Sequence, residues 1–420
     1  MILSLTIANF LSINEKLTLS LEATSIKEHR DRNCFNVPNK EKQLLKGIGL
    51  FGPNSSGKSN ILKALGFMRS FVLNSFLEIH ATESINVERF KLSTATNDKP
   101  SFFEIEFFSY DKKYRYGFEV DKSKVLSEWL FYTSRKQEKK CFTRSAELFE
   151  IESGFAEGWN FQKYVRDNSL AVSVMAQFNG PTSKEIYQWF KEVVIINDSN
   201  YLDFINSTAE LTNKDKTKSY LRKFLNAGDL GFDEIEITEN PVDPNQFTFL
   251  SDEIRTLVAS KLPKYIDIKT RHKKLDNQGN LADIVLMDFK KEESLGTQKF
   301  FALAGPIIKS LINGTPIIID ELDARLHPQL SKMIIQLFNS IDNQNHSQLI
   351  FVTHNTNILT EDILRRDQMI LVFKGGGHNT EFKSVYDLKV RYDASFEKDY
   401  LSGKYGAIPG KGHSQLNLFN

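Results

Sequence analysis

The stretch GPNSSGKSN at residues 52–60 has the residue types and the spacing needed to bind a phosphate group. Main-chain amides of a glycine-rich turn, followed by the start of a helix, point their hydrogens at phosphate oxygens. Lys58 would add a mobile positive charge, and Ser59 would offer a hydroxyl to Mg²⁺. The stretch matches the P-loop pattern, and we predict that all of its residues contact a nucleotide: Gly52, Pro53, Asn54, Ser55, Ser56, Gly57, Lys58, Ser59 and Asn60.

A pair of acidic residues follows the apolar residues 316–319. A buried strand would place Asp320 and Glu321 at the carboxyl edge of a sheet, where open α/β sheets bind their ligands. Asp320 would hold Mg²⁺ through water, and Glu321 would polarise an attacking water molecule. Two acids can simply begin a solvated loop, but their combination with the P-loop favours a role in phosphate chemistry.

Two further motifs come in a fixed order around the acidic pair. The run SLGTQ, residues 294–298, opens a predicted helix, and His354 ends the strand-like run FVTH. Alone, a serine at a helix start is more often a cap than a ligand, and a single histidine is more often a structural donor than a catalyst.

Taken in order, these four motifs resemble those of ABC-type ATPases of the SMC and OLD group. The resemblance covers residues 1–120 and 265–410. Asn54 and Asn60, the run DELDARLHP and the run YLSGKYGAIP at 400–409 resemble the OLD-like and abortive-infection branch. It implies a signature motif that includes Ser294, Gly296 and Thr297 and completes the nucleotide site of the opposite subunit. It also implies that Asp323 lies in a loop that communicates between the two sites, and that His354 is a switch histidine near the γ-phosphate.

The sequence departs from this pattern in two places. No glutamine lies between Ser59 and Tyr132, so the usual glutamine-loop contact to Mg²⁺ has no assigned residue, and residues 87–92 occupy its approximate place. OLD nucleases continue into a C-terminal TOPRIM domain, whereas this sequence ends at Asn420 soon after the ATPase motifs. We therefore do not expect nuclease activity within this polypeptide.

The elements that must position these residues form an α/β pattern. Alternating runs before residue 147 predict an antiparallel β subdomain around the P-loop, and residues 148–264 read as a helical insertion. Residues 265–420 begin with two predicted strands and then alternate between helix and strand. One of these predicted helices covers NTNILT at residues 355–360. We expect an α/β P-loop NTPase of the ABC-type head class, with lobes at 1–147 and 265–420.

The composition is that of an ordinary globular chain. The sequence has 420 residues, of which 40% are hydrophobic and 25% charged, and a net charge of +1 gives no reason to expect a membrane. Two distant cysteines and no signal peptide favour reduced thiols in the cytoplasm. Basic runs at 213–223 and 269–274 leave DNA open as a partner, although acids lie among or near them.

The motifs and the resemblance together predict an ATP- and Mg²⁺-dependent switch. We expect a head-to-head dimer or a higher oligomer that senses phage infection in bacteria and controls a separate effector such as a nuclease. Two alternatives remain: an SMC-like ATPase of DNA repair or chromosome maintenance, and a nucleotide-gated scaffold that holds a toxin. A long coiled-coil arm would favour the former, and the sequence has no heptad run of that length.

Overall fold

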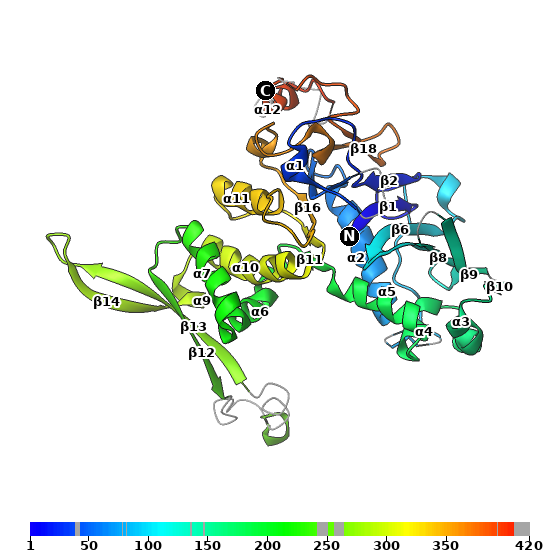
Figure 1. The fold of residues 1–420 in the computed structure, drawn as a ribbon, viewed down its shortest axis with the longest axis horizontal. Coiled ribbons are helices and arrows are strands. Elements are labelled where there is room, and N and C mark those ends of the chain that lie inside the picture. The colour runs from blue at the N-terminus through cyan, green and yellow to red at the C-terminus, as the bar shows by residue number, and fades with distance from the viewer. Residues whose placement is uncertain are drawn as a thin grey trace, which may run out of the picture. The chain divides into compact units, whose positions relative to one another are not determined.

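The computed structural model describes residues 1–37, 43–77, 79–80, 82–134, 137–145, 148–241, 251–255, 264–392 and 394–406. The chain divides into two compact units (Figure 1). Unit 1 comprises residues 1–197, 310–324 and 331–420, and unit 2 comprises residues 198–309 and 325–330. The C-terminal run 400–409, part of the predicted resemblance, lies partly outside the described residues.

A six-stranded, mainly parallel sheet forms the centre of unit 1. Only its last pair, β17 with β18, is antiparallel. The five parallel strands are almost wholly apolar, because both faces of a parallel sheet are covered, whereas the antiparallel edge strand β18 has the mixed sequence TEFKS. In spatial order they are β11 (Val194–Ile196), β15 (Ile317–Ile319), β16 (Leu349–Val352), β5 (Gly47–Phe51), β17 (Met369–Lys374) and β18 (Thr380–Ser384).

A seven-stranded antiparallel sheet is the second layer of unit 1. Its β6–β7 and β8–β9 hairpins occupy the runs predicted to be strands, and alternate residues of β6 are buried. In spatial order the strands are β10 (Phe149–Ile151), β9 (Gln137–Ser145), β8 (Val125–Ser134), β7 (Lys112–Val120), β6 (Ser101–Ser109), β1 (Ile2–Ala8) and β2 (Leu17–Ser20).

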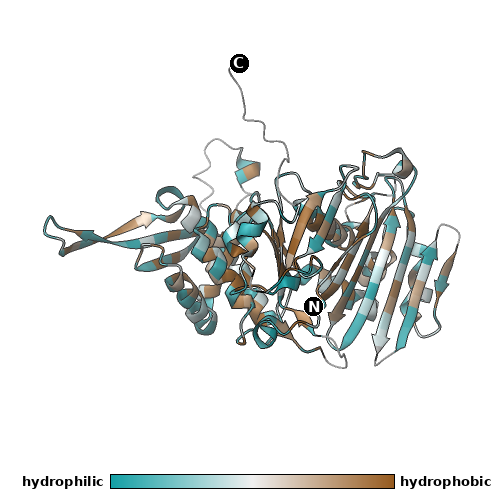
Figure 2. Cartoon of the chain, turned by 90° about the horizontal axis from the view of Figure 1, so that it is seen from above, coloured by the Kyte–Doolittle hydropathy of each residue, from teal (hydrophilic) through white to brown (hydrophobic). Residues whose placement is uncertain are grey.

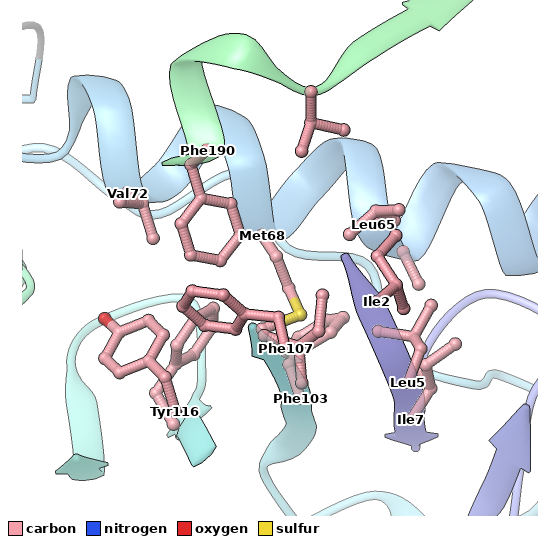
Figure 3. Close-up of a cluster of buried hydrophobic side chains, with 14 of the residues drawn as sticks. Ile2, Leu5, Ile7, Leu65, Met68, Val72, Phe103, Phe107, Tyr116 and Phe190 are labelled. Carbon is pink, nitrogen blue, oxygen red and sulfur yellow. The ribbon is translucent and has the colours of Figure 1, made fainter. Parts of the chain in front are cut away.

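The hydrophobic core of unit 1 lies between α2 (Lys58–Asn74) and the antiparallel sheet (Figure 3). Met68 and Leu65 point from α2 toward Phe103 and Phe107 of β6, and Phe190 of α5 (Pro181–Glu192) joins them. All five side chains are at most 1% exposed, and full burial of each is worth roughly 1.5–3 kcal/mol. The helix that begins at the P-loop is therefore held against a packed layer.

Short elements complete unit 1. They are α1 (Arg30–Asn33), β3 (Cys34–Phe35), β4 (Leu44–Leu45), η1 (Thr94–Thr96), α3 (Ala156–Phe161), η2 (Gln162–Tyr164), α4 (Ala171–Gln177), most of α11 (Pro328–Phe338), η6 (Thr356–Ile358), η7 (Arg366–Gln368) and α12 (Phe396–Leu401).

Unit 2 combines helices with a three-stranded antiparallel sheet. The β13–β14 hairpin, which contains the two strands predicted at the start of residues 265–420, turns at residues 276–280 and mixes hydrophilic and hydrophobic residues along its length (Figure 2). The elements are η3 (Tyr201–Asp203), α6 (Phe204–Ala209), η4 (Glu210–Asn213), α7 (Asp215–Ala227), β12 (Glu234–Pro241), β13 (Lys264–Leu275), β14 (Leu281–Asp288), α9 (Phe289–Glu292) and most of α10 (Leu295–Asn313).

Helix α10 contains Pro306 in its interior. Proline has no amide hydrogen, so the carbonyl four residues earlier, that of Ala302, loses its usual partner. The Thr208 hydroxyl of α6 donates to Ala302 O at 3.1 Å and accepts from the Gly305 amide at 2.9 Å. A Cβ at Gly305 would lie 2.4 Å from the Thr208 hydroxyl oxygen, so glycine permits this approach.

Two sequence expectations differ from the structure. The run NTNILT forms only the short 3₁₀ turn η6, because the Thr353 and Asn355 side chains accept hydrogen bonds from amides two residues further on and compete with a helix. Residues 148–264 are not one helical segment: helices α3 to α5 belong to unit 1, and the described part of the stretch also contains strands β10, β11 and β12.

Candidate functional site

The predicted phosphate-binding loop follows β5, whose five residues are all buried between β16 and β17. Helix α2 begins at Lys58, so the strand, loop and helix occur in the expected order. Gly57 has a φ of +99°, and a Cβ there would lie 1.8 Å from Thr380 Oγ1. Glycine is therefore required at this position both for its backbone conformation and for space.

Lys58 folds back over the loop to which it belongs. Its Nζ donates to Gly52 O at 2.8 Å and to Pro53 O at 2.9 Å, and the residue is only 4% exposed. Burial lowers the pKa of Lys58 to about 8, and the nearby carboxylates of Asp320, Asp323 and Glu321 oppose this shift. The charged form of the Lys58 ammonium group is thus poorly solvated in the free protein. An anionic ligand beside it would stabilise this charged form.

Ser59 and Asp320, the two predicted metal ligands, lie next to each other. Ser59 Oγ donates to Asp320 Oδ1 at 3.1 Å. The position of Asp320 is fixed because its amide donates to Ile196 O of β11 at 2.8 Å. A hydroxyl and a carboxylate together match the oxygen ligands that Mg²⁺ prefers, so Ser59 and Asp320 are suited to hold this ion.

The loop after β15 carries the other predicted acid. Glu321 has a φ of +51° and accepts a main-chain hydrogen bond from Ala324 at 3.1 Å, which closes a tight turn. Asp323, two residues on, accepts from the His354 amide at 3.1 Å through Oδ1. Unit 1 therefore brings together the P-loop, the acidic pair and the main chain of His354, whose side chain is exposed.

A network of three polar side chains supports the P-loop, and sequence reasoning missed it. Asn60 Nδ2 donates to Ser12 Oγ at 2.7 Å, and Ser12 Oγ and Thr380 Oγ1 lie 2.6 Å apart. Thr380 also donates to Ser56 O at 3.1 Å. Asn60, predicted to contact nucleotide, is thus engaged with the protein here. Nothing in the sequence around Ser12 or Thr380 distinguishes them from ordinary turn and strand residues.

Residues 87–92, which occupy the approximate place of the missing glutamine loop, pack beside the turn that carries Ser12. The Leu11 amide donates to Glu88 O at 2.8 Å, and the Phe90 amide donates to Asn9 Oδ1 at 3.1 Å. The segment is therefore anchored by its main chain close to a residue that touches the P-loop network.

The predicted signature motif belongs to unit 2, whereas the other predicted motifs belong to unit 1. Ser294 acts as the cap of α10, because its Oγ accepts from the Thr297 amide at 3.1 Å. A Cβ at Gly296 would lie 2.6 Å from Arg325 O, so the start of α10 packs closely on that main chain. The Ser294 and Thr297 hydroxyls lie 2.9 Å apart; Ser294 is exposed and Thr297 is half-buried.

An ion-pair cluster lies beside the signature motif within unit 2 and was not predicted. Arg325 donates to Asp198 Oδ2 at 3.0 Å and to the Tyr201 hydroxyl at 2.9 Å. Lys299, two residues after Thr297 in α10, lies 3.8 Å from Asp198 Oδ1. Asp198 therefore joins α10 to the stretch that follows the acidic pair in sequence.

The basic run 269–274 lies in β13 among carboxylates of the same unit. Arg271 pairs with Glu234 at 3.2 Å, and Lys273 pairs with Asp233 at 2.9 Å. Because these charges are largely balanced locally, the arrangement weakens the case for DNA at this strand.

Three features define a P-loop ATPase head of the ABC type: a P-loop after the central strand β5 of a mainly parallel sheet, an acidic pair after β15, which is separated from β5 by β16 alone, and an antiparallel second layer. This confirms the predicted fold class. Residues 48–360 match the family described as "AAA domain, putative AbiEii toxin, Type IV TA system". The chain therefore belongs to this family, whose members are ATPases in general.

Solved structures with some similarity include SMC head domains. One is the SMC head domain from Thermotoga maritima, at 14% identity and a TM-score of 0.42, covering 91% of this chain and 98% of that one. Another is an Smc head bound to the C-winged helix domain of ScpA, at 14% identity and a TM-score of 0.43, covering 93% and 99%. These values are too low to carry an argument. No curated protein gives a significant match.

Two further observations bear on the environment of the chain. Among the described residues, no helix has the length and apolar character that a membrane span requires. Cys34 and Cys141 are both free and buried, and burial raises the pKa of Cys34 to about 11 and that of Cys141 to about 12.

Proposed function

We propose that this protein is an ATP-binding and ATP-hydrolysing dimeric switch, the sensor subunit of a bacterial abortive-infection system in the cytoplasm. The 3.1 Å hydrogen bond between Ser59 and Asp320 carries the proposal. It places the metal ligand of the P-loop beside the metal ligand of the acidic strand, a pairing that phosphoryl chemistry requires and that a structural loop does not.

Each residue of the site has a role in this proposal. Lys58 leaves the carbonyls of Gly52 and Pro53 and binds the β- and γ-phosphates. Ser59 and Asp320 hold Mg²⁺, which would neutralise phosphate charge when it is bound. Glu321 accepts a proton from the attacking water as general base, and His354 contacts the γ-phosphate side of the site.

The proposed dimer rests on the resemblance to ABC-type ATPases, whose signature motif completes the nucleotide site of the opposite subunit. One head supplies the P-loop, and the partner head supplies Ser294, Gly296 and Thr297 at the start of α10, where a helix amino end favours a phosphate. Two composite sites then close when ATP binds and open after hydrolysis. The exposed Ser294, whose hydroxyl lies 2.9 Å from that of Thr297, fits such a role.

The biological setting rests on the family, whose description names a "putative AbiEii toxin" and a "Type IV TA system". We infer that the ATPase cycle controls a separate effector such as a nuclease, as in the OLD-like branch. The long coiled-coil arm that would favour chromosome maintenance is missing from the described residues, where the longest helix, α10, has 19 residues.

Phosphate release by the purified protein, with and without DNA, tests the proposal. We expect ATP turnover that depends on Mg²⁺ and does not require DNA. We also expect the Glu321→Gln variant to bind ATP but to hydrolyse it orders of magnitude more slowly. Turnover that requires DNA would favour the repair alternative. ATP binding without any turnover would favour the scaffold that holds a toxin. Normal turnover by Glu321→Gln would remove Glu321 as the base.

A further inference from the structure

Asn60, Ser12 and Thr380, which we call the hydroxyl network, form hydrogen bonds with one defined direction. A carbonyl can only accept, so Thr380 gives its single hydroxyl proton to Ser56 O at 3.1 Å. The 2.6 Å hydrogen bond between Ser12 Oγ and Thr380 Oγ1 must therefore use the Ser12 proton. Ser12 Oγ in turn accepts from Asn60 Nδ2 at 2.7 Å. The donors thus run in order from Asn60 through Ser12 and Thr380 to the Ser56 carbonyl.

The hydroxyl network fixes the orientation of the peptide that joins Ser56 to Gly57. A trans peptide is planar, and its carbonyl and its amide hydrogen point to opposite sides. Because the carbonyl points at the Thr380 hydroxyl, the Gly57 amide hydrogen points away from Thr380. Gly57 is half-buried, and its amide has no acceptor among the described residues. This amide is therefore free to donate to a ligand in the P-loop.

Gly57 packs closely against the two hydroxyls. A Cβ there would lie 1.8 Å from Thr380 Oγ1 and 2.7 Å from Ser12 Oγ, so this side of the glycine is closed to a ligand. The main chain holds the same segments together, since the Thr380 amide donates to Ser12 O at 2.7 Å. A substitution that removes the Thr380 hydroxyl keeps this main-chain bond, so it changes the hydroxyl network without releasing β18.

We propose that Thr380 and Ser12 are positioning residues for nucleotide binding. They hold the Ser56–Gly57 peptide so that the Gly57 amide donates to a phosphate oxygen, and Asn60 acts through Ser12. Ser56 is only 1% exposed, so without the Thr380 hydroxyl its carbonyl would lack a partner and the peptide would turn to find one. A donor that is already oriented binds an anion without a cost of reorganisation. The proposal rests on the phosphate site of the proposed function.

Binding of Mg²⁺ and ADP to the full chain, measured by calorimetry, tests the proposal without hydrolysis. Thr380→Val replaces the hydroxyl with a methyl group of similar size, and we expect roughly tenfold weaker ADP binding, the effect of about one hydrogen bond. Thr380→Ser restores the hydroxyl and should bind ADP within about threefold of the wild type. The matched control is Thr18→Val, which removes a hydroxyl 3.0 Å from that of Thr6 and should bind ADP normally.

Ser12→Ala gives a second test, which also serves if Thr380→Val does not fold. Ser12 acts through Thr380, so Ser12→Ala alone should weaken ADP binding by roughly threefold, less than Thr380→Val does. Adding Ser12→Ala to Thr380→Val should weaken ADP binding by less than about twofold more, because both changes act on one peptide. Thermal unfolding without nucleotide shows that each variant is folded. Normal ADP binding by folded Ser12→Ala would overturn the role of Ser12.

Nuclear magnetic resonance observes the Gly57 amide directly. Serine labelled with ¹³C at its carbonyl and glycine labelled with ¹⁵N give signals only from Ser–Gly pairs, and the sequence has three, at residues 56–57, 153–154 and 402–403. Mg²⁺ and ADP should move the Gly57 amide proton downfield in the wild type, because it donates to an anion. In Thr380→Val this signal should start at a different position and move less, and Thr380→Ser should restore the wild-type shift. A wild-type shift in Thr380→Val would contradict the positioning role.

The outcomes separate this proposal from the proposed function. Unchanged ADP binding by folded Thr380→Val, or equal losses in Thr380→Val and Thr380→Ser, would overturn the positioning role while ATP turnover by the wild type stands. Weaker ADP binding in Thr380→Val and its recovery in Thr380→Ser, in a protein that hydrolyses no ATP, would support the positioning role and remove the proposed function. A wild type that binds no ADP would remove both.

Discussion

The main-chain amide of His354 donates a hydrogen bond to Asp323 Oδ1 at 3.1 Å, so the loop after β15 and the end of β16 are tied together. Asp323→Ala removes the acceptor, whereas Asp323→Asn keeps an oxygen at the same place. We expect Asp323→Ala to bind ATP with nearly unchanged affinity and to lose tenfold or more in turnover, because His354 is no longer held. Asp323→Asn should retain most of the turnover, and equal loss in both variants would show that the charge matters instead.

The Lys58→Ala variant should lose most of its ATP affinity while it remains folded. A point charge that faces the phosphates disappears, and charge-assisted hydrogen bonds are worth about 1.5–3 kcal/mol each, or roughly 10- to 150-fold in affinity. Lys63→Ala, on an exposed position of the same helix, is the matched control and should bind normally. Isothermal titration calorimetry compares the two. Unchanged affinity in a folded Lys58→Ala protein would contradict the P-loop assignment.

Nucleotide affinity should fall as the pH rises above about 8. Burial lowers the pKa of Lys58 to about 8 in the free protein, and bound phosphates would raise it again, so the complex holds more protons than the free protein. Binding at pH 9 should therefore take up about one proton, and the affinity should fall up to tenfold per pH unit. Calorimetry in buffers of different ionisation enthalpy measures this proton. In the absence of ligand the same shift stabilises the fold as the pH rises from 8 toward 10.5, because the unfolded chain keeps the proton longer.

Ser59→Ala and Asp320→Asn should each weaken the dependence of ATP binding on Mg²⁺. The two side chains act through one ion, so the double variant should be little worse than the stronger single variant, and their effects should not add. ATP titrations with Mg²⁺ and with EDTA give the comparison, and the EDTA series should differ little between the proteins. If the losses of ATP affinity were fully additive, the two residues would not act through one shared ion.

Ser294 allows the cap and the signature role to be separated. Ser294→Asp keeps a cap acceptor for the Thr297 amide and should preserve stability, but its charge would face the phosphate of the partner site and abolish hydrolysis. Ser294→Ala should cost about 1 kcal/mol of stability through the lost cap. If Ser294→Asp hydrolyses ATP normally, Ser294 is only a cap.

Mixing two inactive variants tests the composite site directly. A heterodimer of Ser294→Arg and Lys58→Ala subunits contains one site with an intact P-loop and an intact signature, while the other site carries both changes. We expect partial recovery of ATPase activity on mixing. A heterodimer shown by native mass spectrometry to form, yet without activity, would contradict independent composite sites.

The parts of the site that depend on local patterns could be predicted from the sequence. A buried run followed by a glycine-rich turn specified β5, the P-loop and α2, and a buried run followed by two acids specified β15 and Asp320. The contacts between Ser12, Asn60 and Thr380 could not be predicted, because two of these residues are 368 positions apart and neither belongs to a distinctive motif. The helix predicted at residues 355–360 is wrong, because side-chain hydrogen bonds accepted by Thr353 and Asn355 favour a short turn over a helix there.

The strand order of the parallel sheet has a consequence for synthesis on the ribosome. Strand β5, residues 47–51, pairs with β16 and β17, which span residues 349–374. The nascent chain must therefore carry the P-loop strand without either neighbour until roughly five-sixths of the 420 residues have been made. Premature termination before residue 349 leaves an exposed apolar strand and no nucleotide site, so incomplete chains cannot compete with the finished protein for ATP.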